Sequence, residues 1–186
     1  MRSLSALSLA LLLAGSPVLA QGPMYGMGRT PTPEEVRAWD IAISPDGDEL
    51  PPGRGTAVEG ALVYRRNCAR CHGADGTEGR APRLVKPDRV REDPWDHGRI
   101  LPIRSPYAPT VWDYINRGMP LNREGTLTAD EVYALTALLL YWNGIIAEDA
   151  VMDAETLPAV QMPNRDNWAP LPDWTPGTPR WPGYPY

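Results

Sequence analysis

The stretch from Cys68 to His72 reads Cys-Ala-Arg-Cys-His. Two thiols three positions apart can add to the two vinyl groups of one haem. The histidine directly after the second thiol can then lie under the iron as an axial ligand. The spacing therefore predicts one covalently attached haem c, bound through Cys68 and Cys71, with His72 as the proximal iron ligand.

Other chemistries of a cysteine pair explain less of this motif. A zinc site needs four ligands, and the remaining imidazole is His97, because His72 is crowded against Cys71. A thioredoxin-like redox pair would lie near a βαβ pattern, and the chain has none. A plain disulfide between Cys68 and Cys71 would not need the histidine. The haem interpretation uses all three residues.

The second axial ligand is predicted to be a methionine further along the chain. Met119 stands between Gly118 and Pro120, after one predicted helix and well before the next. Proline favours an extended conformation of the residue before it, and glycine lets the backbone approach a flat ring closely. A thioether ligand raises the potential of a haem and suits an electron carrier.

Other side chains compete with Met119 for this position. His97 would give a haem with two histidine ligands and a lower potential. Met24 and Met27 lie in an N-terminal arm, and Met152 and Met162 lie beyond the last predicted helix. A methionine can also be simple core filler, but filler has no need of a flanking glycine and proline.

A turn that follows the haem motif is expected to support His72. A ligating histidine nearly always donates its second N–H to a carbonyl or a carboxylate. The natural acceptor is the carbonyl of Pro82, with Leu84 packing on the haem. The alternative is an ordinary surface turn.

Three Thr-x-x-Glu capping boxes mark the starts of helices. They predict helices from Thr32 to about Trp39, from Thr56 to about Asn67, and from Thr128 to a stop at Asn143. A further helix is predicted from about Thr110 to Arg117. No alternating strand pattern of useful length is present, so the predicted fold class is all-α.

The helix that leads into the haem motif carries an unusual glycine. Gly60, Tyr64 and Cys68 share one face of it. Because glycine inside a helix costs about 1 kcal/mol relative to alanine, another helix is expected to approach closely at Gly60. The last helix, apolar at three- and four-residue steps, is expected to be largely buried.

The two ends of the chain differ from its middle. Residues 1–20 have the pattern of a signal peptide: Arg2, an apolar run too short to span a bilayer, and Val18-Leu19-Ala20 before a cleavage site after Ala20. Export to the periplasm is expected, with no membrane span. Proline-rich composition predicts an N-terminal arm over 21–55 and a C-terminal arm over 147–186, around a haem domain at 56–146.

The charge of the chain limits its partners. It has 18 basic and 23 acidic residues, so loss of Arg2 leaves 17 against 23, a net charge of −6. This charge argues against nucleic acid or an anionic membrane as a partner. It suits docking onto a basic protein surface, or it simply keeps the protein in solution. No nucleophile–base set accompanies the haem motif, so the chain is predicted not to be an enzyme itself.

The order of these residues resembles class I cytochrome c. The positions that carry the resemblance are Gly60, Tyr64, Cys68, Cys71, His72, Pro82, Leu84 and Met119. The resemblance implies a class I cytochrome c fold, here with extended N- and C-terminal arms. In that fold the first and last core helices cross, and Gly60 and Tyr64 meet the face of Tyr141 and its neighbours.

The flanking sequence is similar to one group within that family, the cytochrome subunits of periplasmic molybdenum sulfite dehydrogenases and of the related sulfane dehydrogenase of the sulfur-oxidising (Sox) system. The resemblance runs from about Thr30 to Trp168. It rests on Trp39-Asp40-Ile41, Pro45-Asp46-Gly47, Leu50 to Gly55, Tyr107 to Ile115, Leu127 to Asn143, and Met162 to Asp166. His97 and the segment from Pro170 to Tyr186 depart from the pattern.

This resemblance implies an electron-transfer subunit. It would accept electrons from a molybdenum-cofactor subunit and pass them to a downstream cytochrome c or oxidase. Tyr107, Trp112 and Arg104 are expected near the haem propionates or the methionine loop, or are ordinary core and surface residues. The alternatives are a free-standing carrier, a subunit of another dehydrogenase, or a haem-based ligand sensor with an open sixth position.

Overall fold

The computed structural model describes residues 27–86 and 100–167. It divides the chain into two compact units, Met1–Asp40 and Ile41–Tyr186. His97, Met24, the expected signal peptide and the segment from Pro170 to Tyr186 lie outside the described residues.

The first unit contains one short helix, α1, from Pro33 to Trp39. Its capping box is present: the Thr32 hydroxyl accepts from the Glu35 N–H, and the Glu35 carboxylate accepts from the Thr32 N–H at 2.8 Å. Arg29 adds a hydrogen bond to the same carboxylate at 2.6 Å. The predicted helix is confirmed, and it buries none of its own side chains.

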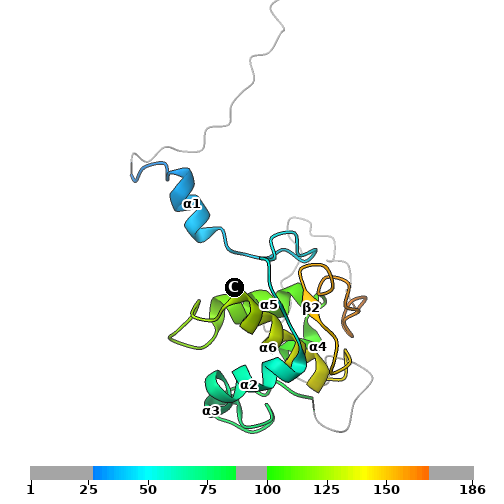
Figure 1. Ribbon diagram of the computed structural model, residues 1–186. Helices are drawn as coiled ribbons and strands as arrows, with labels where there is room; N and C mark the ends of the chain where they lie inside the picture. The colour runs from blue at the N-terminus through cyan, green and yellow to red at the C-terminus, as the bar shows by residue number, and fades with distance from the viewer. Residues whose placement is uncertain (1–26, 87–99, 168–186) are drawn as a thin grey trace, which may run out of the picture. The chain divides into compact units, whose positions relative to one another are not determined.

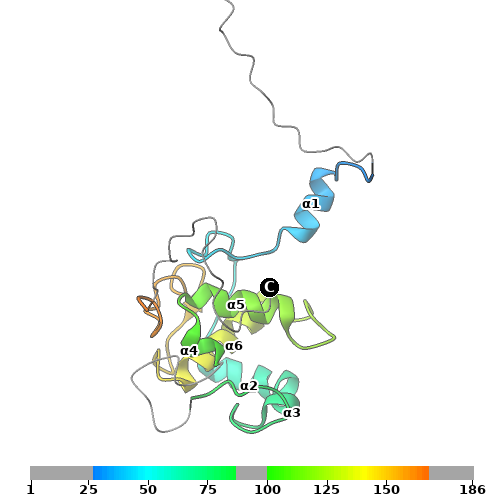
Figure 2. The ribbon, with the colours of Figure 1, turned by 180° about the vertical axis from the view of Figure 1, so that it is seen from behind.

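The second unit is helical and carries the haem motif (Figures 1 and 2). Its elements in chain order are β1 (Arg54–Gly55), α2 (Ala57–Asn67), α3 (Ala69–His72), α4 (Leu101–Arg104), α5 (Ala108–Gly118), α6 (Ala129–Trp142) and β2 (Met152–Asp153). In the part of the chain that the structure describes, no helix is long and apolar enough to cross a membrane.

The predicted helices that bracket the domain are both present. Thr56 caps α2 and Thr128 caps α6, each in a reciprocal capping box with the glutamate three residues on. Every residue from Val132 to Leu140 is buried. A helix that is apolar on all sides belongs in the interior, so α6 forms the centre of the unit.

The crossing of α2 and α6 depends on two glycines that face Ala134. A Cβ added at Gly60 would lie 2.0 Å from the Ala134 carbonyl oxygen, and one added at Gly55 would lie 2.4 Å from the Ala134 nitrogen. One turn further along, the Tyr64 ring meets the Trp142 ring edge-on at 4.8 Å. The close approach expected at Gly60 is therefore present. Gly60 contacts Ala134, and Tyr64 contacts Trp142, the neighbour of Tyr141 in the sequence.

Several boundaries differ from the sequence-based prediction. α5 begins at Ala108, two residues before the expected Thr110, because Pro109 suits the first turn of a helix and does not block it. α3 and α4 are single turns, too short to show a periodic pattern. β1 and β2 form a two-residue antiparallel ladder between segments far apart in sequence.

The segments that flank the helices also enter the core. Leu50 before α2 and Met152, Leu157 and Met162 after α6 are all buried. The Tyr133 hydroxyl on α6 donates to the Pro51 carbonyl at 2.9 Å. Proline-rich composition predicted arms over 21–55 and 147–186. In their described parts these four large apolar residues are buried, whereas Ile41 and Val151 are exposed.

Candidate haem-binding site

The haem motif begins where α2 ends. The Cys68 N–H still donates to the Tyr64 carbonyl at 2.8 Å, and the single turn α3 then carries Cys71 and His72. Both thiols are free and half-buried, on one short turn. Burial, with a smaller effect from Cys71, raises the pKa of the Cys68 thiol to about 11.

The His72 side chain is buried and held in one orientation. Its Nδ1 lies 2.8 Å from the Pro82 carbonyl oxygen, which is the hydrogen bond expected from the sequence. A neutral imidazole has one N–H, so donation from Nδ1 leaves the lone pair of Nε2 available for a metal. The donor set is therefore of the kind that a c-type haem requires on its proximal side.

The loop after His72 is fixed by main-chain contacts. The Tyr64 hydroxyl donates to the Gly73 carbonyl at 3.0 Å, and the Ala81 N–H donates to the Cys71 carbonyl at 2.9 Å. Gly73 has φ +83° and packs against the Glu78 carbonyl, a position that only glycine occupies without strain. These contacts bring Pro82 back beneath His72.

Asn143 is a site residue that sequence reasoning took only for a helix stop. Its buried amide donates to the Leu139 carbonyl at 2.7 Å and to the Leu84 carbonyl at 3.0 Å, and its oxygen accepts from the Lys86 N–H at 2.9 Å. It therefore ties the Pro82–Lys86 segment to the end of α6. An asparagine just after a predicted helix carried no signal for this longer-range role.

Met119 caps the C-terminal end of α5. Its backbone is extended (φ −133°, ψ 151°), its peptide bond to Pro120 is cis, and its side chain is half-buried against the core. Arg123 in the following loop donates to the Asn67 side chain at 3.2 Å, next to Cys68. The methionine loop and the haem motif therefore lie side by side.

Gly118 fits the close approach of a group that is not protein. Its φ is not positive, and among the described residues a Cβ added there would meet only the Tyr114 ring, at 3.9 Å. Within the described part of the chain, neither backbone conformation nor protein packing therefore requires glycine at this position. Close approach of a flat prosthetic group beside Met119 would account for it.

Trp112 also fits such a group. It lies on α5 with its ring buried, tilted against Tyr133 at a centroid distance of 5.5 Å. Within the described residues its indole N–H has no acceptor. Buried donors are nearly always satisfied, and a haem propionate is an acceptor of the kind expected at this residue.

The other residues expected near the propionates have protein partners. The Tyr107 ring lies under the Arg165 guanidinium at 4.4 Å. The buried Asn164 donates to the Arg104 carbonyl at 2.6 Å. The Met-Pro-Asn-Arg segment is thus packed onto the turn between α4 and α5.

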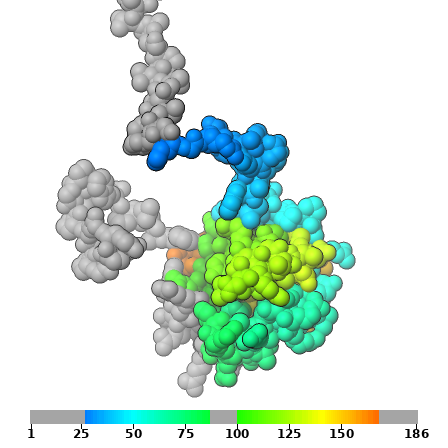
Figure 3. All heavy atoms as spheres, turned by 90° about the vertical axis from the view of Figure 1, so that its left-hand side faces the viewer, coloured from blue at the N-terminus to red at the C-terminus, as the bar shows by residue number. Residues whose placement is uncertain are grey.

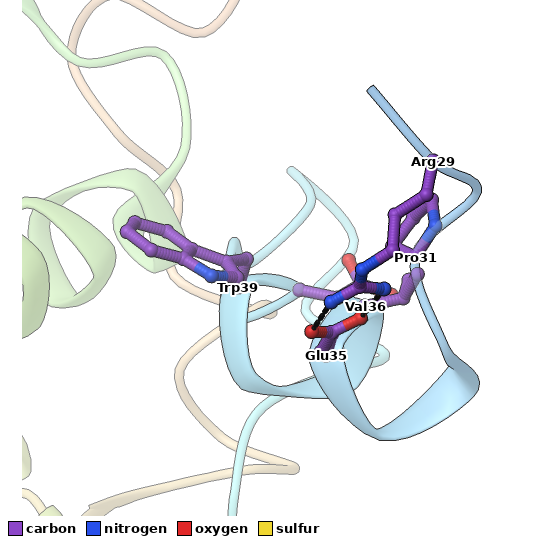
Figure 4. A pocket seen from close by; sticks show the side chains of 6 residues that line it. Arg29, Pro31, Glu35, Val36 and Trp39 are labelled. Carbon is purple, nitrogen blue, oxygen red and sulfur yellow. Dashed lines mark hydrogen bonds and ion pairs between the residues drawn. The ribbon is translucent and has the colours of Figure 1, made fainter. Parts of the chain in front are cut away.

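A pocket in the first unit has a different character (Figure 4). It is lined by Arg29, Pro31, Glu35, Val36, Trp39 and Asp40. The Arg29 hydrogen bond lowers the pKa of Glu35, and that carboxylate also caps α1. The polar groups of this pocket thus hold the start of α1, and no thiol or imidazole lines the pocket.

Comparison with known proteins identifies the family of this chain. The family model described as cytochrome c oxidase, cbb3-type, subunit III, matches residues 55–139. A chain in the crystal structure of the sulfane dehydrogenase SoxCD from Paracoccus pantotrophus is 38% identical, over 79% of this chain and 72% of that chain, with a TM-score of 0.67. This protein is a class I c-type cytochrome. No curated protein matches the cytochrome.

Because the chain belongs to this family, it has an electron-transfer domain of the kind that binds haem c. The all-α prediction and the class I fold are confirmed. The cytochrome's own contribution is the surroundings just described: two thiols on one turn, an oriented imidazole, and a methionine loop that lies next to them.

Proposed function

We propose that the cytochrome holds one haem c, bound covalently through Cys68 and Cys71, with His72 and Met119 as axial ligands. When bound, the haem supplies reversible one-electron transfer at the iron. Pro82 orients His72 through the 2.8 Å hydrogen bond, and Leu84 and Trp112 would contact the group. Tyr107 would have a supporting role, through the contact of its ring with the Arg165 guanidinium.

We further propose that this cytochrome accepts electrons from a molybdenum-dependent sulfite or sulfane dehydrogenase subunit. It would pass them to a downstream cytochrome c or oxidase, and would itself be non-catalytic. The supporting observation is the similarity to a chain of SoxCD over 79% of the sequence. Residues 56–146 make up only about half of the chain, so that similarity includes the flanking segments, which a generic carrier would not share.

Co-purification tests the partner. The tagged cytochrome, expressed with the genes beside its own, should retain a molybdenum-containing protein in equal amount, and sulfite or a sulfane compound should reduce its haem. A cytochrome that stays alone and is not reduced by that mixture would favour a free-standing carrier.

Substitution tests the ligands. Met119→Ala should abolish the weak charge-transfer band of a thioether-bound ferric haem and lower the potential. Met152→Ala is the matched control, because it removes a methionine from the core and should lower stability while leaving the band in place. A band that survives in Met119→Ala would exclude Met119 and point to another methionine as the sixth ligand. A parent protein that lacks the band would instead point to His97.

The expected processing belongs to the same proposal. Residues 1–20 would act as a signal peptide, the mature protein would begin at Gln21 in the periplasm, and arms at 21–55 and 147–186 would flank the haem domain at 56–146. Amino-terminal sequencing of the haem-loaded protein from a periplasmic fraction tests the first of these assignments. A sequence that begins at Met1 would contradict it.

A further inference from the structure

The helix that leads to Met119, α5, has different contacts on its two sides. Trp112 and Ile115 are buried in the core, and Met119 packs against that same core. Another side of α5 carries Asp113 and Arg117, which lie one turn apart and therefore face each other. The contacts on this second side are polar, although Asp113 is buried.

The Asp113 carboxylate joins two segments of the chain. Its side chain is only 9% exposed. Arg117 donates from Nε to Oδ1 at 2.8 Å, and its Nη2 donates to Oδ2. The same Oδ1 accepts from the Ile43 N–H at 3.1 Å. The carboxylate therefore spans the last turn of α5 and ties this turn to the segment that precedes β1.

The segment that supplies the Ile43 N–H is itself folded. The Gly47 N–H donates to the Ser44 carbonyl at 3.0 Å, and the Leu50 N–H donates to the Gly47 carbonyl at 3.0 Å. Leu50 is buried, and a Cβ added at Gly47 would lie 3.4 Å from the Pro109 ring of α5. Ile43 thus offers its N–H from a turn that already contacts α5.

The loop after Met119 gives the methionine little support. Residues 121–126 are all exposed, and Figure 3 shows this loop, in yellow-green, at the centre of the face that it presents. Among the described residues, its side-chain hydrogen bond to another element runs from Arg123 to Asn67, at 3.2 Å. The position of the Met119 side chain therefore depends on where α5 ends.

The burial of Asp113 indicates that its ion pair does more than stabilise the fold. In the other ion pairs between described residues, the carboxylate side chain is at least 29% exposed. Burying a charge pair is costly, and apolar residues in its place often leave stability unchanged or higher. Two charge-assisted bonds between planar groups do, however, fix one geometry. The pair therefore supplies a defined position for the end of α5.

We propose that Asp113 is a positioning residue for Met119. Through Arg117 and Ile43 it holds the last turn of α5 in place, so that the thioether stays bound to the haem iron. This inference rests on the proposed role of Met119 as an axial ligand. Helix ends open readily because their last carbonyls lack partners within the helix. The bond to Arg117 opposes this opening, and the bond to Ile43 keeps the turn from moving as a body.

The test measures how easily an added ligand displaces the thioether. Imidazole is titrated into the oxidised, haem-loaded protein at about pH 8, where imidazole is largely neutral. Loss of the thioether charge-transfer band gives its dissociation constant. Because imidazole competes with Met119 for the iron, its affinity should rise when the methionine is held less firmly.

Two substitutions separate position from charge. Asp113→Asn and Arg117→Gln should each raise the affinity for imidazole about tenfold, because each removes a charge-assisted bond across the last turn of α5. They change the local charge in opposite directions, so an effect of charge alone would shift the two affinities in opposite directions. Arg117→Lys keeps the charge without the planar geometry and should also bind imidazole more tightly than the parent.

Met152→Ala is the control for a general loss of stability. It removes a buried side chain of β2, a strand that pairs with β1. Its affinity for imidazole should stay within about twofold of the parent. Opposite shifts in Asp113→Asn and Arg117→Gln would overturn the proposal, and so would shifts no larger than that of Met152→Ala.

Met119→Ala separates a failure of this inference from a failure of the proposed function. It has no thioether to displace, so it should bind imidazole more tightly than any of the other variants. If it binds imidazole no more tightly than the parent, Met119 is not the ligand. If it binds imidazole tightly while Asp113→Asn and Arg117→Gln match the parent, the ligand assignment stands and the positioning role is excluded.

Discussion

Asn143 joins two parts of the haem site through one side chain. It uses both amide hydrogens and its oxygen, bonding Leu139 on its own helix and Leu84 and Lys86 on the proximal loop. Because Pro82 orients His72 from that same loop, Asn143 helps to set the position of the proposed proximal ligand.

Asn143→Ala should lower the free energy of unfolding by about 2–3 kcal/mol, because it leaves buried polar partners unsatisfied. Denaturant unfolding of the haem-loaded protein measures this loss. Asn143→Asp keeps the acceptor for Lys86 but has no N–H to offer the two carbonyls, so it should not rescue stability. Full stability in the alanine variant would show that the three bonds contribute nothing net.

Tyr133 makes the free energy of unfolding depend on pH in the alkaline range. It is fully buried, and burial, with a smaller effect of Asp153, raises the pKa of its hydroxyl to about 12. Since the folded pKa lies above the unfolded one, its contribution is complete below about pH 10 and is lost as the pH rises from 10 to 12.

Tyr133→Phe should therefore be less stable than the parent by about 1–2 kcal/mol at neutral pH, partly because its bond to the Pro51 carbonyl is lost. The difference should shrink as the pH approaches 12. Chemical unfolding at a series of pH values from 7 to 12 measures it. A difference that stays constant over this range would mean that Tyr133 has an ordinary pKa in the folded state.

At the scale of elements, the domain depends on how closely α2 can approach α6. Gly55 in β1 and Gly60 in α2 both face backbone atoms of Ala134, not the end of a flexible side chain. Movement of a neighbouring rotamer therefore cannot relieve a clash, and the helices themselves would have to separate.

Gly60→Ala should destabilise the cytochrome by about 2–3 kcal/mol, because overpacking outweighs the gain in helix propensity. Thermal or denaturant unfolding detects the change. Leu62→Ala, at an exposed position of the same helix, should change stability by no more than about 0.5 kcal/mol. If Gly60→Ala were as stable as the parent, α2 and α6 could separate at no cost.

Helices with a local signal were predictable from sequence, and those without one were not. The three Thr-x-x-Glu capping boxes predicted α1, α2 and α6, and Gly60 predicted a close helix crossing, which is that of α2 with α6. The single turns α3 and α4 and the two-residue ladder have no periodicity to detect. Within the site, His72 and Pro82 follow from the motif, whereas Asn143 depends on a contact across 59 residues of chain.

At the scale of the whole molecule, the segments that flank the helices belong to the folded body. The ladder joins Arg54 to Asp153 and Gly55 to Met152, so residues before α2 and after α6 close on each other. The buried Leu157 and Met162 extend the core beyond the last helix. The haem domain expected at 56–146 is thus shorter than the part of the chain that packs together.

A chain truncated after Ile146 should therefore fail to fold stably, because it loses β2 and three large buried side chains, each contributing about 1.5–3 kcal/mol. Circular dichroism and the yield of haem-loaded protein are suitable measurements. A chain truncated after Asn167 is the control and should fold. A stable, haem-loaded 21–146 product would show that the C-terminal segment is dispensable.

The contact of Gly55 and Gly60 with Ala134 also has an evolutionary consequence. A clash between two side chains can be relieved by a second, compensating mutation at the partner. Here the atoms within 2.4 Å are the nitrogen and carbonyl oxygen of Ala134, which no substitution at that position removes. Among descendants of this chain, we therefore expect both glycines to persist without co-varying partners, and to change only where α6 has docked in a new position.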